Sequence, residues 1–342
     1  MKKLIRITLI SLGTLVLIVG ILALAMFLTT RFYTDGSDLP SEQNGLALDN
    51  WMSAIRDDAK MCEIAMPGAH DAGCIDMMWA YQTQNKTIAE QLTMGVRYFD
   101  LRTANVGGTL KIYHESFIGV ALAPILDAIS FFLEQNPTEA LLLDFQHFYD
   151  EDAIDATKNA LQQTLGGKVV RNDKGVDDVT FVNSLTLAET RGKCVVFWGS
   201  VQGSHDSDWL FLRDNDDGTR TGASLHSYYK REYNTQPSKT YIAECLPLYI
   251  EQFRQSNGGI FVLQGQLTDK LYVFGPAIHE VLHARNMNSY LGGLDDETVK
   301  TVNVVMRDYV TPQKSMITII LNLKKENVKT EYAAVLNTWS EK

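Results

Sequence analysis

The chain has 342 residues, of which 45% are hydrophobic and 21% charged, and its formal net charge is −10 at pH 7. A general nucleic-acid-binding domain is usually basic, and this sequence has no stripe of Lys and Arg, so we predict no nucleic-acid partner. The acidity also argues against binding to anionic membranes through overall charge, because like charges repel. Any contact with lipid must therefore come from an anchor or a local patch.

The amino terminus predicts a membrane anchor. Residues 1–6 form a basic start, and residues 7–28 follow as an apolar segment without a charge. About 20 apolar residues are enough to cross a bilayer, whereas the apolar core of a cleaved signal peptide has about 7–15. We predict a single-pass signal anchor with its amino terminus in the cytosol and the remaining chain outside the cytoplasm, because the basic residues precede the span. Secretion after cleavage near Ala23-Leu24-Ala25 is the alternative.

The rest of the chain is predicted to be a linker and one domain. Residues 29–48 form the predicted linker, because the stretch 34–44 is polar and contains Gly and Pro. Residues 49–342 are roughly 290 residues, which is usual for an α/β barrel. The cysteines show no CxxC spacing and predict no zinc ribbon. The sequence leaves open whether the four cysteines form disulfides or remain free thiols; they are Cys62, Cys74, Cys194 and Cys245. The oligomeric state also stays open.

From Leu46 onward, predicted strands and helices alternate, which is typical of parallel strands joined by helical crossovers. We therefore predict an α/β fold, an irregular TIM-type (β/α) barrel. Seven strands are predicted near 63–66, 96–102, 110–114, 140–145, 193–198, 260–264 and 302–306, with an eighth near 225–229. Helices are predicted near 88–94, 124–135, 152–165 and 277–290, with a closing helix near 316–323. The polar stretch 201–234 is predicted to form loops at the active-site face.

Ionisable residues lie at the ends of the first three predicted strands. His70 and Asp71 follow the first strand, Asp100 and Arg102 end the second, and His114 ends the third. The carboxyl ends of barrel strands carry the catalytic groups of TIM barrels. Two imidazoles can move protons near neutral pH, carboxylates can orient them, and a guanidinium can bind an anion. This pattern predicts acid–base chemistry on an anionic substrate.

Several motifs, taken together and in order, resemble bacterial-type phosphatidylinositol-specific phospholipase C of the X-domain family. They are NWMSA at 50–54, MPGAHD at 66–71, GVRYFDLR at 95–102, IYH at 112–114, NPTE at 136–139 and Asp308. The resemblance covers nearly the whole predicted domain. It implies a TIM barrel and a phosphodiesterase/lyase that cleaves phosphatidylinositol or a glycosyl-phosphatidylinositol (GPI) to diacylglycerol and inositol 1,2-cyclic phosphate. A phosphatidylinositol-type lipid and its membrane are the implied partners.

The resemblance also implies the roles of the acid–base residues. His70 resembles the general base that takes the proton from the inositol 2-hydroxyl, and Asp308 resembles the carboxylate that orients it. His114 resembles the general acid that protonates the departing diacylglycerol, with Asp71 as its partner. Asp100 is implied to lie in the same hydrogen-bonding cluster.

Arg102 resembles the arginine that binds the substrate phosphate. It stands where eukaryotic relatives have a calcium ligand, and Asp71 stands where they carry Asn, so the resemblance implies a calcium-independent enzyme without a metal or cofactor. Tyr233 resembles the tyrosine that stacks on inositol. Two positions depart from the family pattern, because Glu115 replaces the usual Gly after the acid histidine and Gln146 replaces a lysine that contacts inositol. Gln146 remains a predicted substrate-binding residue, and the headgroup preference stays open.

Two alternative functions remain. A catalytically weakened barrel that binds a phospholipid or its headgroup is consistent with the departures at Glu115 and Gln146. A zinc metalloprotease is the second, since HEVLH at 279–283 matches the HExxH motif on a predicted helix. No third ligand motif follows it, however, and the apolar residues Val281 and Leu282 fit an amphipathic surface helix outside the barrel.

Overall fold

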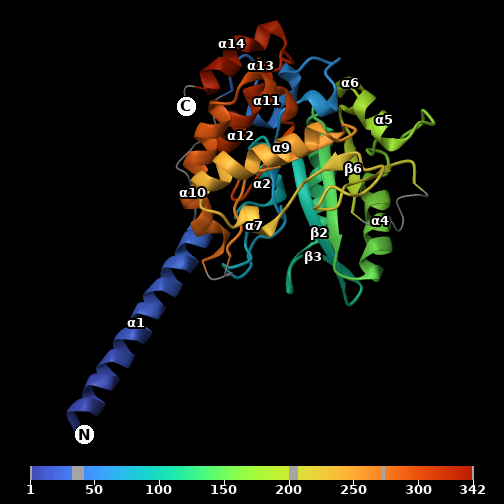
Figure 1. Ribbon diagram of the computed structural model, residues 1–342. Helices are drawn as coiled ribbons and strands as arrows, with labels where there is room; N and C mark the ends of the chain where they lie inside the picture. Colours follow the sequence, from blue (N-terminus) through green and yellow to red (C-terminus); the bar gives the residue numbers. More distant parts are fainter. Residues whose placement is uncertain (1, 33–41, 200–206, 271–273, 341–342) are drawn as a thin grey trace.

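A barrel of parallel strands forms the centre of the protein (Figure 1). The computed structural model describes residues 2–32, 42–199, 207–270 and 274–340. Within these residues, the barrel strands lie in the order β7-β6-β5-β2-β1-β10-β9-β8, and the isolated pairing of Arg213 with Leu225 joins β7 to β8. The barrel is thus nearly closed, as predicted. Its strands are β1 (Met66–Ala69), β2 (Tyr98–Val106), β5 (Leu141–Phe148), β6 (Cys194–Trp198), β7 (Leu210–Leu212), β8 (Leu225–His226), β9 (Ile260–Gln264) and β10 (Val304–Arg307).

Helices surround the barrel. The amino-terminal ones are α1 (Lys2–Phe32), α2 (Ile88–Thr93), α3 (Leu122–Gln135), α4 (Glu151–Leu165), α5 (Asp178–Ser184), α6 (Leu187–Thr190), α7 (Arg231–Asn234) and α8 (Ser238–Thr240). They are followed by α9 (Leu246–Arg254), α10 (Gly275–Gly292), α11 (Asp296–Thr301), α12 (Pro312–Ile319), α13 (Leu321–Lys324) and α14 (Thr330–Trp339). Short helical turns cover Leu48–Ala54, Met61–Glu63 and Tyr241–Cys245. The predicted closing helix near 316–323 is wrong, because α12 and α13 divide that region and α14 ends the fold.

Alternating side chains of β2 separate the barrel interior from its helical cover. Phe99 and Leu101 pack outward with residues of α3 and α4. Tyr98 points inward and donates a hydrogen bond to Asp144 of β5 at 2.7 Å. Asp100 and Arg102 share this inward face, since side chains alternate along a strand. The same alternation that buries β2 therefore directs its ionisable residues toward the barrel axis.

The third predicted strand is present but is not a barrel strand. β3 (Thr109–His114) runs antiparallel to β2, with Val106 paired to Thr109, and β4 (Phe117–Ala121) pairs with β3. Gly107 and Gly108 form the turn with φ of +58° and +83°, which is the backbone that a two-residue hairpin requires. His114 thus reaches the barrel mouth at the end of a returning hairpin strand. The prediction that it ends a parallel barrel strand is wrong, and the strands β4 and β7 were not predicted.

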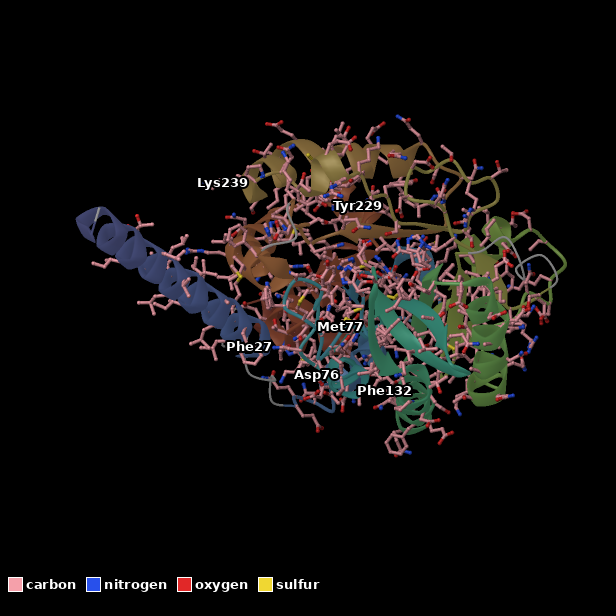
Figure 2. The ribbon with its side chains drawn as sticks, turned by 90° about the horizontal axis from the view of Figure 1, so that it is seen from below. Phe27, Asp76, Met77, Phe132, Tyr229 and Lys239 are labelled. Atoms are coloured by element: carbon pink, nitrogen blue, oxygen red, sulfur yellow. The ribbon has the colours of Figure 1, made fainter. Side chains whose placement is uncertain are left out.

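Helix α1 contains the predicted membrane span. Residues Ile10–Thr29 are long and apolar enough to cross a bilayer, and most of their described side chains are exposed. The carboxyl-terminal part of α1 packs on α10, and Phe27 lies where α1 meets the domain (Figure 2). Most of the predicted tether at 34–44 lies outside the described residues. Leu46 and Leu48, at the end of the predicted linker, are buried in one hydrophobic core with residues of the barrel strands.

A buried ion pair joins three of the sequence motifs. The Arg97 guanidinium contacts the Glu139 carboxylate at 2.8 Å, and both side chains are fully buried. Glu139 also accepts a hydrogen bond from the Met52 backbone at 3.1 Å. These residues belong to the stretches 95–102, 136–139 and 50–54, so part of the sequence pattern serves the scaffold.

We expect Glu139→Ala to lower the free energy of unfolding by about 3–5 kcal/mol, because it leaves the Arg97 charge buried without its partner. Chemical denaturation would measure the change. Asp58→Ala is the matched control, since Asp58 pairs with Arg56 on the surface and exposed pairs contribute only about 0–1 kcal/mol. Equal effects of the two substitutions would contradict the prediction.

Candidate active site

The ends of β1 and β10 position the first histidine and its carboxylate. The two strands are neighbours, with Ala69 opposite Arg307, so the next residues, His70 and Asp308, emerge side by side. The Gln84 side chain donates hydrogen bonds to the carbonyls of His70 and Arg307, both at 3.0 Å. Both strand ends are therefore held before the side chains leave the sheet.

His70 is oriented by Asp308. The His70 Nδ1 atom lies 2.7 Å from Asp308 Oδ1, so the carboxylate holds the tautomer that carries its proton on Nδ1. The Nε2 atom is left to face Asp71 Oδ2 at 3.4 Å. In the neutral ring, this arrangement leaves Nε2 able to accept a proton from a bound molecule.

His114 approaches the same carboxylate from the β3–β4 hairpin. Its Nδ1 donates a hydrogen bond to the Tyr81 carbonyl at 2.6 Å, and its Nε2 lies 3.5 Å from Asp71 Oδ2. The Nε2 atoms of the two histidines thus lie on the same oxygen of Asp71. Asp71 itself has a φ of +42°, a conformation that costs energy for a non-glycine residue and is often found at functional sites.

Arg102 and Asp100 complete the cluster from β2. Arg102 Nε contacts Asp71 Oδ1 at 2.7 Å, and its terminal nitrogen donates to Gln146 Oε1 at 3.2 Å. Asp100 Oδ2 accepts a hydrogen bond from the Asp71 backbone at 3.2 Å. The structure therefore brings together all six residues predicted as catalytic: His70, Asp71, Asp100, Arg102, His114 and Asp308.

The cluster shifts the pKa values of its members. Burial opposes charge on His70, but Asp71 and then Asp308 raise its pKa to about 9. Burial likewise opposes charge on Asp71, and Arg102 with the histidines overcomes it and lowers the pKa to about 2. Burial, followed by the charge of Asp71, raises the pKa of Asp100 to about 7. Asp71 thus stays ionised, while Asp100 can carry a proton near neutral pH.

We expect Asp308→Asn to lower the pKa of His70 from about 9, because it removes one of the three carboxylates that stabilise the imidazolium while burial remains. Protonated His70 stabilises the fold below pH about 6.5, its ordinary pKa, and this contribution is lost as the pH rises through about 9. The substitution should therefore move the loss to lower pH. Histidine NMR titration measures the pKa directly, with Asp58→Asn as a control, and an unchanged pKa would contradict the assigned pairing.

The comparison with known proteins agrees with this geometry. Residues 61–199 match the family model "Phosphatidylinositol-specific phospholipase C, X domain". This segment is an X domain of that family. It holds five of the six clustered residues, and Asp308 follows it in sequence. The four-strand portion from β1 to β6 that carries the site is thus the part of the barrel that the family model matches.

Two relatives and one solved structure extend the comparison. The 1-phosphatidylinositol phosphodiesterase of Listeria monocytogenes is 22% identical over 295 residues, which cover 83% of this chain and 88% of the relative. The enzyme of the same name from Staphylococcus aureus is 29% identical over 160 residues, 44% of this chain and 50% of the relative. The structure of the phosphatidylinositol-specific phospholipase C from L. monocytogenes matches 83% of this chain and 100% of that chain, with a TM-score of 0.63 and 19% identity. This last likeness shows a shared fold.

A cavity of about 270 Å³ adjoins the cluster. Its small volume and its many polar lining residues suit a headgroup of monosaccharide size more than an acyl chain. Charged and polar side chains predominate in its lining, which includes His70, Arg102, His114, Glu115, Gln146, His147, Asp216, Tyr229, Arg231, Thr268, Asp269 and Asp308. Acidic and basic side chains in one cavity can accept and donate hydrogen bonds with the hydroxyl groups of a polyol.

The structure places the remaining predicted residues as follows. Gln146 lies in the cavity wall, between Arg102 and Asp216. Tyr233 does not line the cavity, because α7 turns its ring toward Tyr249 in the core beside α9. Tyr229, just before α7, is the tyrosine in the cavity lining.

Position 115 explains one departure from the family pattern. Glu115 has a φ of +54°, in the left-handed region that glycine occupies without strain. A glycine is therefore favoured by the backbone at this turn, and Glu115 adopts the same turn with a side chain that reaches the cavity lining.

Several cavity residues were not predicted from the sequence, namely His147, Asp216, Tyr229, Arg231 and Asp269. Three of them lie in or directly beside the poorly patterned stretch 201–234, which was predicted to form active-site loops. That polar, strand-poor composition was the available signal, but it could not say which side chains turn inward. Since only the fold brings these loops over the barrel mouth, the individual residues could not be chosen from sequence.

Within the described residues, His279 and His283 of the HEVLH stretch belong to no group of three potential metal ligands. His283 is buried and its Nδ1 lies 2.7 Å from Ser238 Oγ, while His279 Nε2 lies 3.7 Å from Asp269. Glu280 is buried, whereas Val281 and Leu282 are 54% and 68% exposed. The predicted surface position of this helix is right, but its predicted amphipathic pattern is inverted, because Glu280 faces inward to Arg307 and Lys314.

Arg307 and Lys314 connect α10 to the active site. Glu280 Oε1 contacts Arg307 at 2.9 Å and Lys314 Nζ at 2.8 Å, and Lys314 Nζ also donates to the Asp308 carbonyl at 3.0 Å. Lys314 and then Arg307 overcome the effect of burial and lower the pKa of Glu280 to about 2.

We expect Glu280→Gln to lower the free energy of unfolding by about 3–5 kcal/mol, because two buried cations lose their shared carboxylate. Thermal and chemical denaturation would measure the loss. Glu297→Gln is the matched control, since Glu297 meets Arg254 at the surface. Unchanged stability of Glu280→Gln, together with zinc bound to the wild-type helix, would instead favour the metalloprotease alternative.

Proposed function

We propose that this protein is a membrane-anchored phospholipase C that cleaves phosphatidylinositol, or a GPI, to diacylglycerol and inositol 1,2-cyclic phosphate. The observation that carries the proposal is the pair of histidines, each held through Nδ1, whose Nε2 atoms meet at Asp71 Oδ2 beside Arg102. The names of the Listeria and Staphylococcus relatives support the same substrate.

The reaction needs no nucleophile from the protein. His70 Nε2 takes the proton from the inositol 2-hydroxyl, whose oxygen forms a bond to phosphorus. The bond from phosphorus to the glycerol oxygen breaks, and His114 Nε2 gives that oxygen a proton. Arg102, which points into the cavity, pairs with the non-bridging oxygens as their charge develops.

Metal independence is part of the proposal. The Arg102 guanidinium is paired with Asp71 and lies against the cavity, where it supplies a fixed positive charge. A cation of this kind can stabilise a phosphoryl transition state without a bound metal. The calcium-independent mechanism expected from the sequence therefore has a candidate group in place.

The anchor places the enzyme beside its substrate. We propose that α1 crosses the membrane once, with the barrel outside the cytoplasm. In Figure 1, α1 and the β2–β3 hairpin extend toward the same lower side of the domain. An anchored barrel in this orientation would hold its mouth near the lipid headgroups of its own membrane. Protease protection of the barrel in sealed membrane vesicles tests the topology, and secretion of a shortened chain would favour signal cleavage instead.

The test uses the full chain in detergent with phosphatidylinositol and excess chelator. Phosphorus NMR should detect a cyclic inositol phosphate as product. Its appearance in chelator supports the metal-free mechanism, and a requirement for added calcium contradicts it. Folded protein that binds inositol phosphate in calorimetry but forms no product on phosphatidylinositol or a GPI would favour the headgroup-binding alternative.

A further inference from the structure

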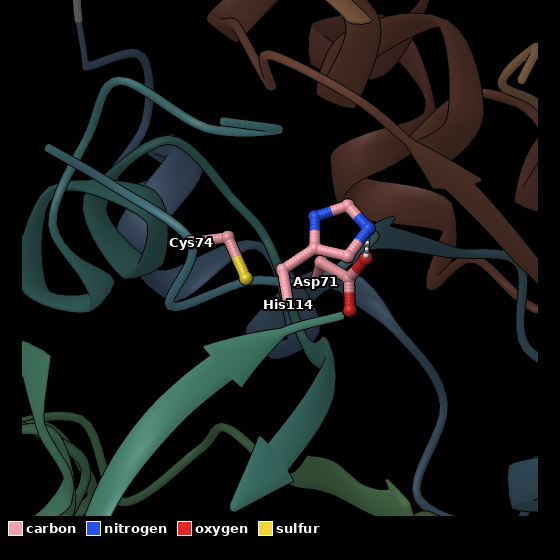
Figure 3. A group of neighbouring side chains, drawn as sticks. All are labelled: Asp71, Cys74 and His114. Carbon is pink, nitrogen blue, oxygen red and sulfur yellow. Dashed lines mark ion pairs between the residues drawn. The ribbon is translucent and has the colours of Figure 1, made fainter. Parts of the chain in front are cut away.

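A thiol lies beside the histidine–carboxylate pair. The potential ligand atoms of Asp71, Cys74 and His114 all lie within 4.8 Å of one another (Figure 3). Cys74 is fully buried in the turn that follows His70 and Asp71, and its thiol faces the Tyr113 carbonyl at 3.8 Å. The proposed reaction uses Asp71 and His114, but it gives no role to Cys74.

Two features prepare this group to receive a cation. Asp71 is 1% exposed, and among the described residues its Oδ2 atom accepts no hydrogen bond, with the Nε2 atoms of His70 and His114 at 3.4 and 3.5 Å as its ion-pair contacts. The His114 ring is already oriented through Nδ1 by the Tyr81 carbonyl, which is how metal-binding histidines are usually held. Its Nε2 therefore faces Asp71 with an electron pair available in the neutral ring.

The ligand types select the metal. One thiolate, one imidazole and one carboxylate form a set that zinc accepts in four-coordinate sites, with water as the fourth ligand. Calcium and magnesium prefer sites made of oxygen ligands alone. We propose that Asp71, Cys74 and His114 form an inhibitory site for zinc and similar soft divalent cations.

Binding and inhibition follow from one event. The Cys74 S–H bond breaks, its proton leaves to solvent, and the sulfur binds the metal together with His114 Nε2 and Asp71 Oδ2. His114 then has no Nε2 proton to give to the departing glycerol oxygen. The inhibitory consequence rests on the proposed function, whereas metal binding does not depend on it.

Cobalt absorption tests the site without an activity measurement. We expect Co²⁺ added to the full chain in detergent to produce a thiolate-to-cobalt charge-transfer band, and Zn²⁺ to displace it. Cys74→Ser and Cys74→Ala should both lack the band; two replacements are used so that one unfolded variant does not decide the result. Cys194→Ser is the matched control, because Cys194 is equally buried but its thiol donates to the Lys168 carbonyl outside this group.

Zinc inhibition is the second readout. Zn²⁺ should inhibit cleavage of phosphatidylinositol by the wild type and by Cys194→Ser, and chelator should reverse the effect. Cys74→Ala should need at least about tenfold more Zn²⁺ for the same inhibition. Losing a ligand weakens metal affinity at least as much as losing a group that only orients a ligand. Absence of the thiolate band from the wild type, or its persistence in a folded Cys74 variant, would overturn the proposal. A thiolate-to-cobalt band in a protein without activity on inositol lipids would contradict only the proposed function and would leave the metal site in place.

Discussion

We expect His70→Ala and His114→Ala each to lower kcat for phosphatidylinositol by at least about 10²–10⁴-fold, the usual contribution of a positioned general base or acid. In the proposed mechanism, His70 Nε2 is the base and His114 Nε2 is the acid. Each ring is oriented through its other nitrogen, which lies 2.7 Å from Asp308 in His70 and 2.6 Å from the Tyr81 carbonyl in His114. Steady-state kinetics in mixed micelles would measure both losses.

A substrate with a different leaving group separates the two roles. An aryl ester of inositol phosphate releases a phenolate, which departs without needing a proton, so it should restore most of the rate of His114→Ala. The same substrate should not restore the rate of His70→Ala, because the inositol 2-hydroxyl must still lose its proton. His283→Ala serves as a control for replacing a buried histidine, since His283 bonds Ser238 away from the cluster. Equal rescue of both active-site variants would contradict the assigned roles.

We expect Arg102→Lys to lower kcat by about 10²–10³-fold with a smaller change in KM, the effect of removing a transition-state hydrogen-bond donor. Lysine keeps the charge but loses the planar guanidinium, which here contacts Asp71 at 2.7 Å and Gln146 at 3.2 Å. A single ammonium group cannot hold these partners and also pair with two phosphate oxygens.

The control for this substitution is Arg171→Lys, at an exposed pair with Asp208. It should leave both kcat and the melting temperature unchanged. A fall of less than about tenfold for Arg102→Lys would mean that charge alone suffices, which would contradict bidentate binding of the phosphate.

The sequence by itself determined the barrel class and predicted which ionisable residues cluster at the barrel mouth. Alternating strand and helix patterns predicted parallel strands, and a residue at the end of a parallel strand must reach the same edge as its neighbours. His70, Asp100 and Arg102 could therefore be placed together before their contacts were known, and the resemblance to the X-domain family implied that Asp308 joins them. The apolar run of α1 was equally plain, because length and hydrophobicity are local properties of the chain.

Only the tertiary structure decided the features that depend on which segments meet. His114 arrives on an antiparallel hairpin, Tyr229 rather than Tyr233 lines the cavity, and Glu280 faces inward from a helix whose exposed positions include Leu282. Each follows from contacts between segments far apart in sequence, and local patterns carry no information about them. Glu280 shows the physical reason, since a buried charge is tolerated where Arg307 and Lys314, from other elements, neutralise it.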